Sequence, residues 1–272
     1  MVDKFEIKSH DGPGRLGKLG EMETPNIFSE NNSSNSKNNS QNNKSNSRNN
    51  KSNSQNLIAK DEEAVYNIEK EIAEWSVRKT LELARREKEN NQDCDIAVIQ
   101  GSKYIDLRIK CAKELECLGY NGLVIANGDD LLLHPRDLVN LIVGLRENIK
   151  PSSYLIFTFA ECQFIPLLSY MGIDGFLDMT GDYYSYLNVM MTPTKNYDLE
   201  VYKIFEMNQE QIAECNKGTI DFVLKEVREH MKNKTLRNLV EERGATSPQI
   251  ASALKILDKD HQEYLQKYTQ LY

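Results

Sequence analysis

The chain has 272 residues and a formal net charge of −7, and 39% of its residues are hydrophobic. Residues 31–56 contain only Asn, Ser, Gln, Lys and Arg, and their four basic side chains contribute +4. Subtracting this from −7 leaves about −11 for the remainder, which argues against a protein that grips nucleic acid by its own charge. Because residues 31–56 have no apolar side chain to offset the entropy of ordering, we predict a disordered insertion at 30–57 rather than an aggregating Asn-rich tract.

The five cysteines are scattered along the chain, with no close pair suited to a metal ion. No apolar run is long enough to span a membrane, and no signal peptide is recognisable. We therefore expect free thiols, a cytoplasmic location, no metal and no cofactor.

The first 29 residues predict a β-hairpin. Residues 4–9 alternate weakly between apolar and polar, and glycines follow at 12, 14, 17 and 20. This spacing contains G-x-G-x-x-G, but no buried strand precedes it and no helix follows. A tight turn between two strands is therefore favoured over a phosphate-binding loop.

The segment after the insertion predicts one long helix or two. Residues 59–88 are rich in Glu, Ala, Lys and Arg, with apolar residues near helical spacing. Trp75 lies on this apolar stripe, so we expect it in the core.

Residues 95–178 predict a parallel α/β arrangement. Short apolar runs at Ile96–Ile99, Gly122–Ala126, Tyr154–Phe159 and Gly172–Leu177 alternate with segments of helical periodicity. Repeated β-α units imply a parallel sheet covered by helices. Chemistry in such sheets gathers at the carboxyl ends of the strands.

The residues after each apolar run are therefore the candidates for function. Gln100 could contact a base through its amide or cap a loop, and Asp178 could be catalytic or a helix cap. Asp129, Asp130 and His134 suggest a metal site, but a polar loop and helix cap is the simpler interpretation. Two arginines, Arg136 and Arg146, could meet phosphate or pair with nearby acids.

The last third of the chain combines an aromatic segment with helices. Residues 183–205 carry five tyrosines and a phenylalanine, which could stack on bases or pack back onto the core, and packing is favoured. Helical signals continue from residue 208 to the end. We therefore divide the chain into a hairpin at 1–29, the insertion at 30–57, a β/α domain at 58–205 and a helical segment at 206–272.

Five segments, taken in chain order, resemble the tRNA-guanine transglycosylase superfamily. The resemblance is strongest to the N-terminal transglycosylase-like part of archaeal archaeosine synthase. The segments are FEIKSHDGPGRLGKLGEMETPNIF, IAVIQGSKYIDLR, GLVIANGDDLLLHPRDLVNLIVGLRE, IPLLSYMGIDGFLD and HMKNKTLRNLVEERGATSPQIASALKILD. The resemblance covers nearly the whole chain outside the insertion. It implies an α/β fold, a partial or degenerate (β/α)8 TIM-type barrel with a C-terminal helical segment.

The resemblance also implies site residues. The parent reaction exchanges a guanine base in tRNA, with a carboxylate attacking the ribose C1′ while the base leaves. Asp178 would occupy the nucleophile position, with Asp174 as the structural aspartate before it or, if the register slips, as the catalytic acid itself. The residues that would contact the base are Gln100, Gly101, Asn127 and Gly128.

The sequence departs from the family pattern at several points. The early D-S-G-G-F-Q segment with its acid-base aspartate is absent, and GIDGFLD has one residue more between its aspartates. The zinc pattern C-x-C-x-x-C and the C-terminal archaeosine synthase block are missing. Base exchange by this chain alone is therefore not expected.

These observations favour a transglycosylase-like component of archaeosine formation in tRNA. It would act with a separate basic partner that carries the missing catalytic and RNA-binding block. Two alternatives remain, a non-catalytic scaffold and an active tRNA-guanine transglycosylase with rearranged acids. Because an incomplete barrel leaves exposed strand edges, we expect an oligomer or heterocomplex.

Overall fold

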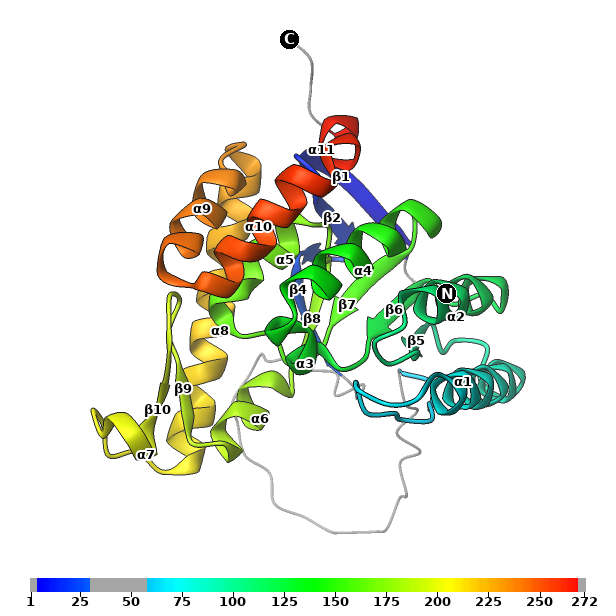
Figure 1. Cartoon of the computed structure of the whole chain (residues 1–272), viewed down its shortest axis with the longest axis horizontal. Coiled ribbons are helices and arrows are strands. Elements are labelled where there is room, and N and C mark those ends of the chain that lie inside the picture. Colours follow the sequence, from blue (N-terminus) through cyan, green and yellow to red (C-terminus); the bar gives the residue numbers. More distant parts are fainter. Residues whose placement is uncertain (1–3, 30–57, 269–272) are drawn as a thin grey trace, which may run out of the picture.

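The fold is built around a five-stranded parallel sheet with strand order β4-β8-β7-β6-β5 (Figure 1). A computed structural model describes residues 4–29 and 58–268, so the insertion predicted at 30–57 lies outside the described residues. The strands are β4 (Asn26–Phe28), β5 (Ile96–Ile99), β6 (Gly122–Ile125), β7 (Tyr154–Phe157) and β8 (Gly175–Leu177). The parallel sheet predicted from the apolar runs is confirmed.

β8 begins later than its apolar run suggested, at Gly175 instead of Gly172. Gly172 has a left-handed backbone (φ 103°) and ends the preceding helix α5 (Ile165–Tyr170), so the chain turns before it can enter the sheet. Asp174 therefore lies before the strand, at the opposite end from Asp178.

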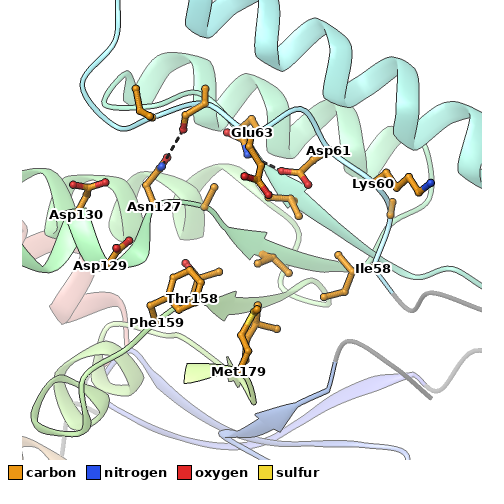
Figure 2. A pocket seen from close by; sticks show the side chains of 18 residues that line it. Ile58, Lys60, Asp61, Glu63, Asn127, Asp129, Asp130, Thr158, Phe159 and Met179 are labelled. Atoms are coloured by element: carbon orange, nitrogen blue, oxygen red, sulfur yellow. Dashed lines mark hydrogen bonds between the residues drawn. The ribbon is translucent and has the colours of Figure 1, made fainter. Parts of the chain in front are cut away.

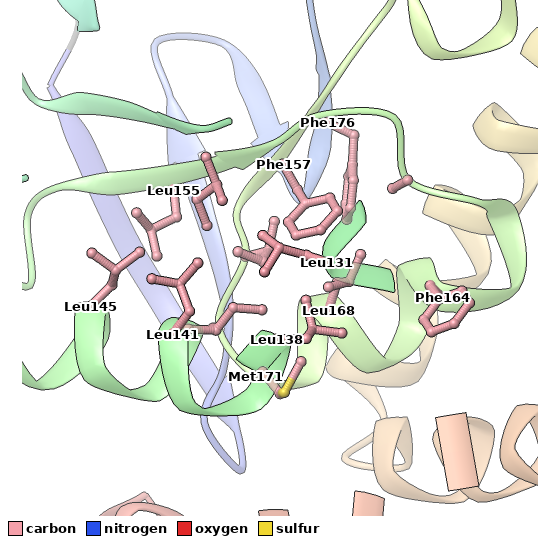
Figure 3. Close-up of a cluster of buried hydrophobic side chains, with 14 of the residues drawn as sticks. Leu131, Leu138, Leu141, Leu145, Leu155, Phe157, Phe164, Leu168, Met171 and Phe176 are labelled. Atoms are coloured by element: carbon pink, nitrogen blue, oxygen red, sulfur yellow. The ribbon is translucent and has the colours of Figure 1, made fainter. Parts of the chain in front are cut away.

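Helices cover one face of the sheet. α2 (Ile105–Cys117) and α4 (Pro135–Asn148) form where the apolar spacing predicted them, and Pro135 occupies the first turn of α4, where a missing N–H costs nothing. Leu138, Leu141 and Leu145 of α4 are fully buried. Figure 3 shows them facing Leu155 and other sheet residues in the larger hydrophobic core.

The opposite face carries a smaller hydrophobic cluster that the N-terminal hairpin helps to close. β1 (Phe5–Asp11) pairs antiparallel with β2 (Gly14–Leu19), which pairs with β3 (Met22–Thr24), so the predicted hairpin is confirmed. Phe5 and Phe28 lie against the Tyr154 ring, with centroid distances of 5.7 and 5.6 Å. This cluster extends along the sheet face from Ile96 and Tyr154, which begin β5 and β7, to Leu177, which ends β8.

The helix predicted over residues 59–88 begins later, and that prediction is wrong for its first third. α1 spans Lys70–Asn90, whereas 58–69 runs as an irregular segment along the end of the sheet. Tertiary partners satisfy its backbone: Ala59 N–H donates to the Ile96 carbonyl (2.8 Å) and Ser76 Oγ donates to the Glu62 carbonyl (2.6 Å). Trp75 is 42% exposed, so its predicted place in the core is also wrong.

The remaining helices join the larger core. α8 (Gln209–Lys232), α9 (Leu236–Thr246) and α10 (Pro248–Asp260) bury apolar faces against it, with α10 on α4 and α9 on α5, and α11 (Gln262–Lys267) follows. Among the helices of the described ranges, none combines the length and apolarity that crossing a bilayer requires.

The aromatic segment divides between packing and exposure. It forms α6 (Thr180–Tyr186), the hairpin of β9 (Val189–Met191) and β10 (Asn196–Asp198), and α7 (Leu199–Tyr202), which project beside α8 in Figure 1. Tyr184 is buried, as packing predicted, whereas Tyr186 and Tyr202 are 75% and 49% exposed. Packing onto the core therefore describes only part of this segment.

Candidate functional site

A cavity of about 720 Å³ opens at the carboxyl end of the parallel strands, and Figure 2 shows the side chains around it. The ends of β5, β6, β7 and β8 supply one side, and the irregular segment 58–65 supplies the other. The polar residues predicted at this edge of the sheet therefore line a cavity. Its polar lining residues are Lys60, Asp61, Glu63, Gln100, Asn127, Asp129, Asp130 and Thr158.

Gln100 follows β5 and is paired with Asp61. Its Nε2 donates to Asp61 Oδ2 at 2.7 Å, and the side chain is almost wholly buried. A carboxylate can only accept here, so the amide nitrogen must face Asp61 and Oε1 must face away. Oε1 is buried and has no hydrogen-bond partner within residues 4–29 and 58–268. Burial raises the pKa of the Asp61 carboxyl, and the hydrogen bond from Gln100 acts against that increase.

Asn127 follows β6 and is held by Arg108. The buried Arg108 guanidinium donates to Asn127 Oδ1 (3.0 Å) and to the carbonyls of Ala126 (2.9 Å) and Ser102 (2.6 Å). Asn127 Nδ2 in turn donates to the Ala64 carbonyl (3.0 Å). One arginine on α2 thus ties the ends of β5 and β6 together and, through Asn127, holds the segment that forms the facing wall.

Two glycines allow the strand ends to approach this closely. Gly101 has φ +143°, and a Cβ there would lie 2.8 Å from the Arg108 side chain. A Cβ on Gly128 would lie 1.9 Å from the Thr158 carbonyl oxygen. Both positions therefore require glycine for packing, whatever they contact in a ligand.

Asp129 and Asp130 lie in the first turn of the short helix α3 (Gly128–Leu133) and point toward the cavity in Figure 2. Asp129 Oδ2 accepts a hydrogen bond from Tyr183 OH (2.8 Å), which together with burial raises the pKa of Tyr183 to about 12. Burial and the adjacent Asp129 raise the pKa of Asp130. No group of three or more His, Cys, Asp or Glu side chains within the described ranges is arranged to hold a metal ion.

The two predicted acids, Asp178 and Asp174, lie at opposite ends of β8. Asp178 directly follows β8, and its neighbours in sequence, Leu177 and Met179, line the cavity, whereas Asp178 itself is not a lining residue. Asp174 is fully buried and lies away from the cavity. Its carboxylate accepts from Arg15 Nε (2.9 Å), from Arg146 Nη2 and from the Leu155 N–H (2.8 Å).

The two candidate phosphate-binding arginines both meet acids. Arg146 is buried against Asp174, and Arg136 pairs with Asp260 on the surface (3.1 Å). Sequence reasoning missed Asp61, Glu63 and Arg108 as site residues. The available signal was the charged run K-D-E-E at 60–63 directly after the Leu57-Ile58-Ala59 apolar triplet, which resembles the strand-end pattern found elsewhere in the chain.

The arrangement defines a class of α/β protein with its ligand site at the carboxyl edge of a parallel sheet. The cavity combines two side-chain amides, Gln100 and Asn127, with carboxylates, so its lining offers both donors and acceptors to a polar ligand.

Comparison with known proteins agrees with this description. Residues 16–234 match the family described as TGT: Queuine tRNA-ribosyltransferase, and the chain belongs to that family. The resemblance found in the sequence motifs is thereby confirmed.

Curated relatives are similar at low identity. A tRNA-guanine(15) transglycosylase of Thermococcus kodakarensis is 28% identical over 223 residues, which covers 73% of this chain and 38% of that protein. An archaeosine synthase of Methanocaldococcus jannaschii is 31% identical over 127 residues, covering 47% of this chain and 21% of that protein. The chain thus spans well under half the length of these relatives.

Proposed function

We propose that the chain takes part in tRNA modification, as a transglycosylase-like component of archaeosine biosynthesis that binds the modified base. The observation that carries this proposal is the Gln100–Asp61 pair among the lining residues of the cavity, in which the buried Gln100 Oε1 has no hydrogen-bond partner in the described part of the chain. A buried acceptor without a partner costs free energy unless a ligand donates to it. The edge of a deazaguanine offers such N–H donors.

The sheet is proposed to be part of a (β/α)8-type barrel. Its order leaves β4 and β5 at the two edges, and in the described ranges a single isolated bridge, from Ile58 to Ile96, adds to β5. Unpaired strand edges favour association, so we propose an oligomer or a complex with a second protein. The cytoplasm is the proposed location.

The charge of the chain supports a division of labour. With a net charge of −7, it attracts phosphate poorly, and the two candidate arginines are already paired with acids. We propose that a basic partner supplies much of the contact with the tRNA backbone and contributes further catalytic groups.

The catalytic contribution of the chain itself is proposed to come from Asp178, which follows β8, with Asp174 holding the fold. Alternatives are a tRNA-binding scaffold without chemistry and a transglycosylase that exchanges guanine for a deazaguanine. The support for a direct role is the place of Asp178 in the chain, directly after β8 and between the lining residues Leu177 and Met179.

The test is binding and turnover with tRNA. Purified chain, with and without its partner, is titrated with tRNA carrying or lacking 7-cyano-7-deazaguanine over a salt series, and Gln100→Ala and Asp178→Asn are compared with the unchanged protein. We expect modification-dependent binding that Gln100→Ala weakens and turnover that Asp178→Asn lowers. Binding that does not depend on the modification would refute the role of the chain in recognising the modified base. Unchanged turnover of the reconstituted pair in both variants would refute a catalytic role.

A further inference from the structure

Exposed apolar side chains gather around α7, at the tip of the β9–β10 hairpin. Residues 200–206 are all exposed, and α7 buries none of its residues. Together with two residues at the end of α6, the large apolar side chains of this region form what we call the α7 patch: Tyr186, Leu187, Val201, Tyr202, Ile204 and Phe205. Each of them is between 45% and 75% exposed. A cluster of exposed apolar side chains marks an interaction surface.

Two hydrogen bonds join the two parts of the α7 patch. The carbonyl of Asn188, which follows Leu187, accepts from the Leu199 N–H (3.0 Å). Asn188 Nδ2 donates to Glu200 Oε1 (2.9 Å). The end of α6 therefore lies against the start of α7, so the apolar side chains on both sides of this junction belong to one surface.

The hairpin that carries the patch is anchored to α8. The buried Asn216 side chain accepts from the Met191 N–H (2.7 Å) at the end of β9. The Tyr202 ring is held by neighbours on the hairpin: Lys195 Nζ lies 4.9 Å from its centroid, and the Tyr197 ring meets it edge-on at 5.5 Å. An ordered surface loses less entropy on binding, which favours association with a partner.

The charges around the patch are mainly negative. Residues 195–210 contain two lysines, Lys195 and Lys203, and four acids: Asp198, Glu200, Glu206 and Glu210. Within residues 4–29 and 58–268, none of the four carboxylates has a cationic group within ion-pair distance. Charge complementarity therefore favours a partner that carries positive charge around an apolar centre.

Three other occupants fit this surface less well. Single-stranded RNA would bring phosphates close to the carboxylates. A second copy of the chain, paired by a two-fold axis, would bring the same carboxylates together. Residues 31–56 of the chain itself carry four basic side chains, but they have no apolar side chain to cover the patch.

We propose that the α7 patch docks a basic protein. Apolar side chains of this partner contact Tyr202 and Phe205, and its Lys and Arg side chains pair with the surrounding carboxylates. Aromatic anchors inside a polar rim are the usual anatomy of a protein interface. None of the patch residues lines the cavity. The inference rests on the proposed function, since it places the basic partner that the proposed function requires.

The experiment measures binding of two synthetic amphipathic helical peptides to the full chain by fluorescence anisotropy. Both peptides carry leucine along one face, and the other face carries lysine in one peptide and glutamate in the other. We expect the lysine peptide to bind about tenfold more tightly at low salt, a difference that shrinks as salt screens the carboxylates. A lysine homopolymer, which lacks the apolar face, should compete poorly.

Substitutions in the patch locate the binding surface. Val201→Ser with Phe205→Ser should weaken binding of the lysine peptide about tenfold. The matched control is Ile72→Ser with Trp75→Ser, which removes two exposed apolar side chains from α1, at the opposite end of the molecule in Figure 1. This control should leave the affinity unchanged. Thermal unfolding verifies that each variant is folded.

A second pair of substitutions separates charge from apolar contact. Glu206→Gln with Glu210→Gln should remove the preference for the lysine peptide and keep weak binding of both peptides. Its control is Glu71→Gln with Glu89→Gln, two exposed acids of α1, which should keep the preference.

Several results would overturn the inference. They are equal affinity for the two peptides, no binding of either, and binding of the lysine peptide that survives Val201→Ser with Phe205→Ser. Sedimentation equilibrium that shows a dimer dissociated by this double substitution would assign the patch to a second copy. Binding of a fluorescent single-stranded RNA that the same substitution abolishes would assign it to RNA.

The proposed function is judged separately, by the tRNA titration with Gln100 and Asp178 variants. If the peptide preference is absent and modified tRNA is still distinguished, the docking surface is refuted and the proposed function stands. If the peptide preference is present and modified tRNA is not distinguished, the proposed function is refuted and the docking surface stands.

Discussion

Arg15 and Asp174 form a buried ion pair between residues 159 positions apart. Arg15 donates from Nε (2.9 Å) and Nη2 (2.5 Å) to the two carboxylate oxygens of Asp174, and both side chains are almost completely buried. Arg15 also donates to the carbonyls of Pro151 (2.7 Å) and Ser153 (2.9 Å). This pair fastens the N-terminal hairpin to the starting edge of the parallel sheet, opposite the cavity.

Replacing Arg15 by Met is expected to lower the free energy of unfolding by about 3–5 kcal/mol, because it leaves a buried carboxylate with one of its arginines missing. Urea denaturation followed by circular dichroism measures this loss. The control is Arg136→Met, which removes an exposed pair with Asp260 and should change stability little. Equal effects of the two substitutions would contradict the structural role of the buried pair.

Gly128→Ala is expected to destabilise the protein by about 3 kcal/mol or more, because the added Cβ would lie 1.9 Å from the Thr158 carbonyl oxygen. Gly218→Ala is the matched control: this glycine lies inside α8 with open space around it, and alanine there should stabilise by about 0.5–1 kcal/mol. Thermal unfolding of both variants tests the pair. A stabilising effect of Gly128→Ala would contradict the close approach of Gly128 to the Thr158 carbonyl oxygen.

Asp61→Asn is expected to raise stability at neutral pH while weakening base binding. The pKa of Asp61 is higher in the folded state than in the unfolded state. Between these two pKa values the folded state therefore binds more protons, and stability falls as the pH rises through this range. Asparagine keeps an acceptor for Gln100 without the charge of the half-buried carboxylate. The gain in Tm should be present at pH 7 and absent near pH 3, where both states are protonated.

Asp106→Asn is the control of opposite sign. Its pKa is lowered, mainly by the hydrogen bond from Lys70, so its contribution to stability is present above the unfolded pKa and is lost as pH falls through the folded pKa. This variant should lower Tm at pH 7. A fall in Tm for Asp61→Asn as well would contradict the uncompensated burial of Asp61.

Asn216→Ala is expected to loosen the β9–β10 hairpin. The buried Asn216 side chain accepts from the Met191 N–H (2.7 Å) and donates to the Val189 carbonyl (2.9 Å), so its removal leaves two buried backbone groups unpaired at a cost of about 2–3 kcal/mol. Hydrogen exchange of the Met191 amide should quicken markedly. The helix-cap variant Asn208→Ala should leave that amide protected, since it loses only the cap of α8, worth about 1 kcal/mol.

The spacing of apolar residues predicted strands and helices correctly where an element buries a regular apolar stripe. Strands β5 to β7 and helices α2 and α4 formed at or within a few residues of their apolar runs, because each buries a regular stripe against the same core. Residues 59–69 had helical composition and yet are not helical. The backbone N–H groups of Ala59 and Glu62 donate to the Ile96 carbonyl of β5 and to Thr80 Oγ1. Asn127 Nδ2 donates to the Ala64 carbonyl, and composition does not record such partners.

The candidate site was predicted in part. Gln100 and Asn127 follow buried strands, and their place at the cavity could be anticipated from the polarity of parallel sheets. Asp61 could not be paired with Gln100, since they are 39 positions apart and their contact depends on how the irregular segment crosses the sheet. The family resemblance gave Asp174 a structural role beside Asp178, but it did not show that the two aspartates lie at opposite ends of β8.

The sequence by itself determined the parallel α/β layout, the N-terminal hairpin and the family, because these follow from local apolar patterns and from motifs in a fixed order. Only the tertiary structure decided which acids face the cavity. Long-range contacts select the partner of each carboxylate: two arginines for Asp174, an amide for Asp61 and a hydroxyl for Asp129. The free energy of a buried carboxylate depends on those partners. The chemical role of each aspartate is therefore set by its contacts in the folded protein and not by its position in the chain.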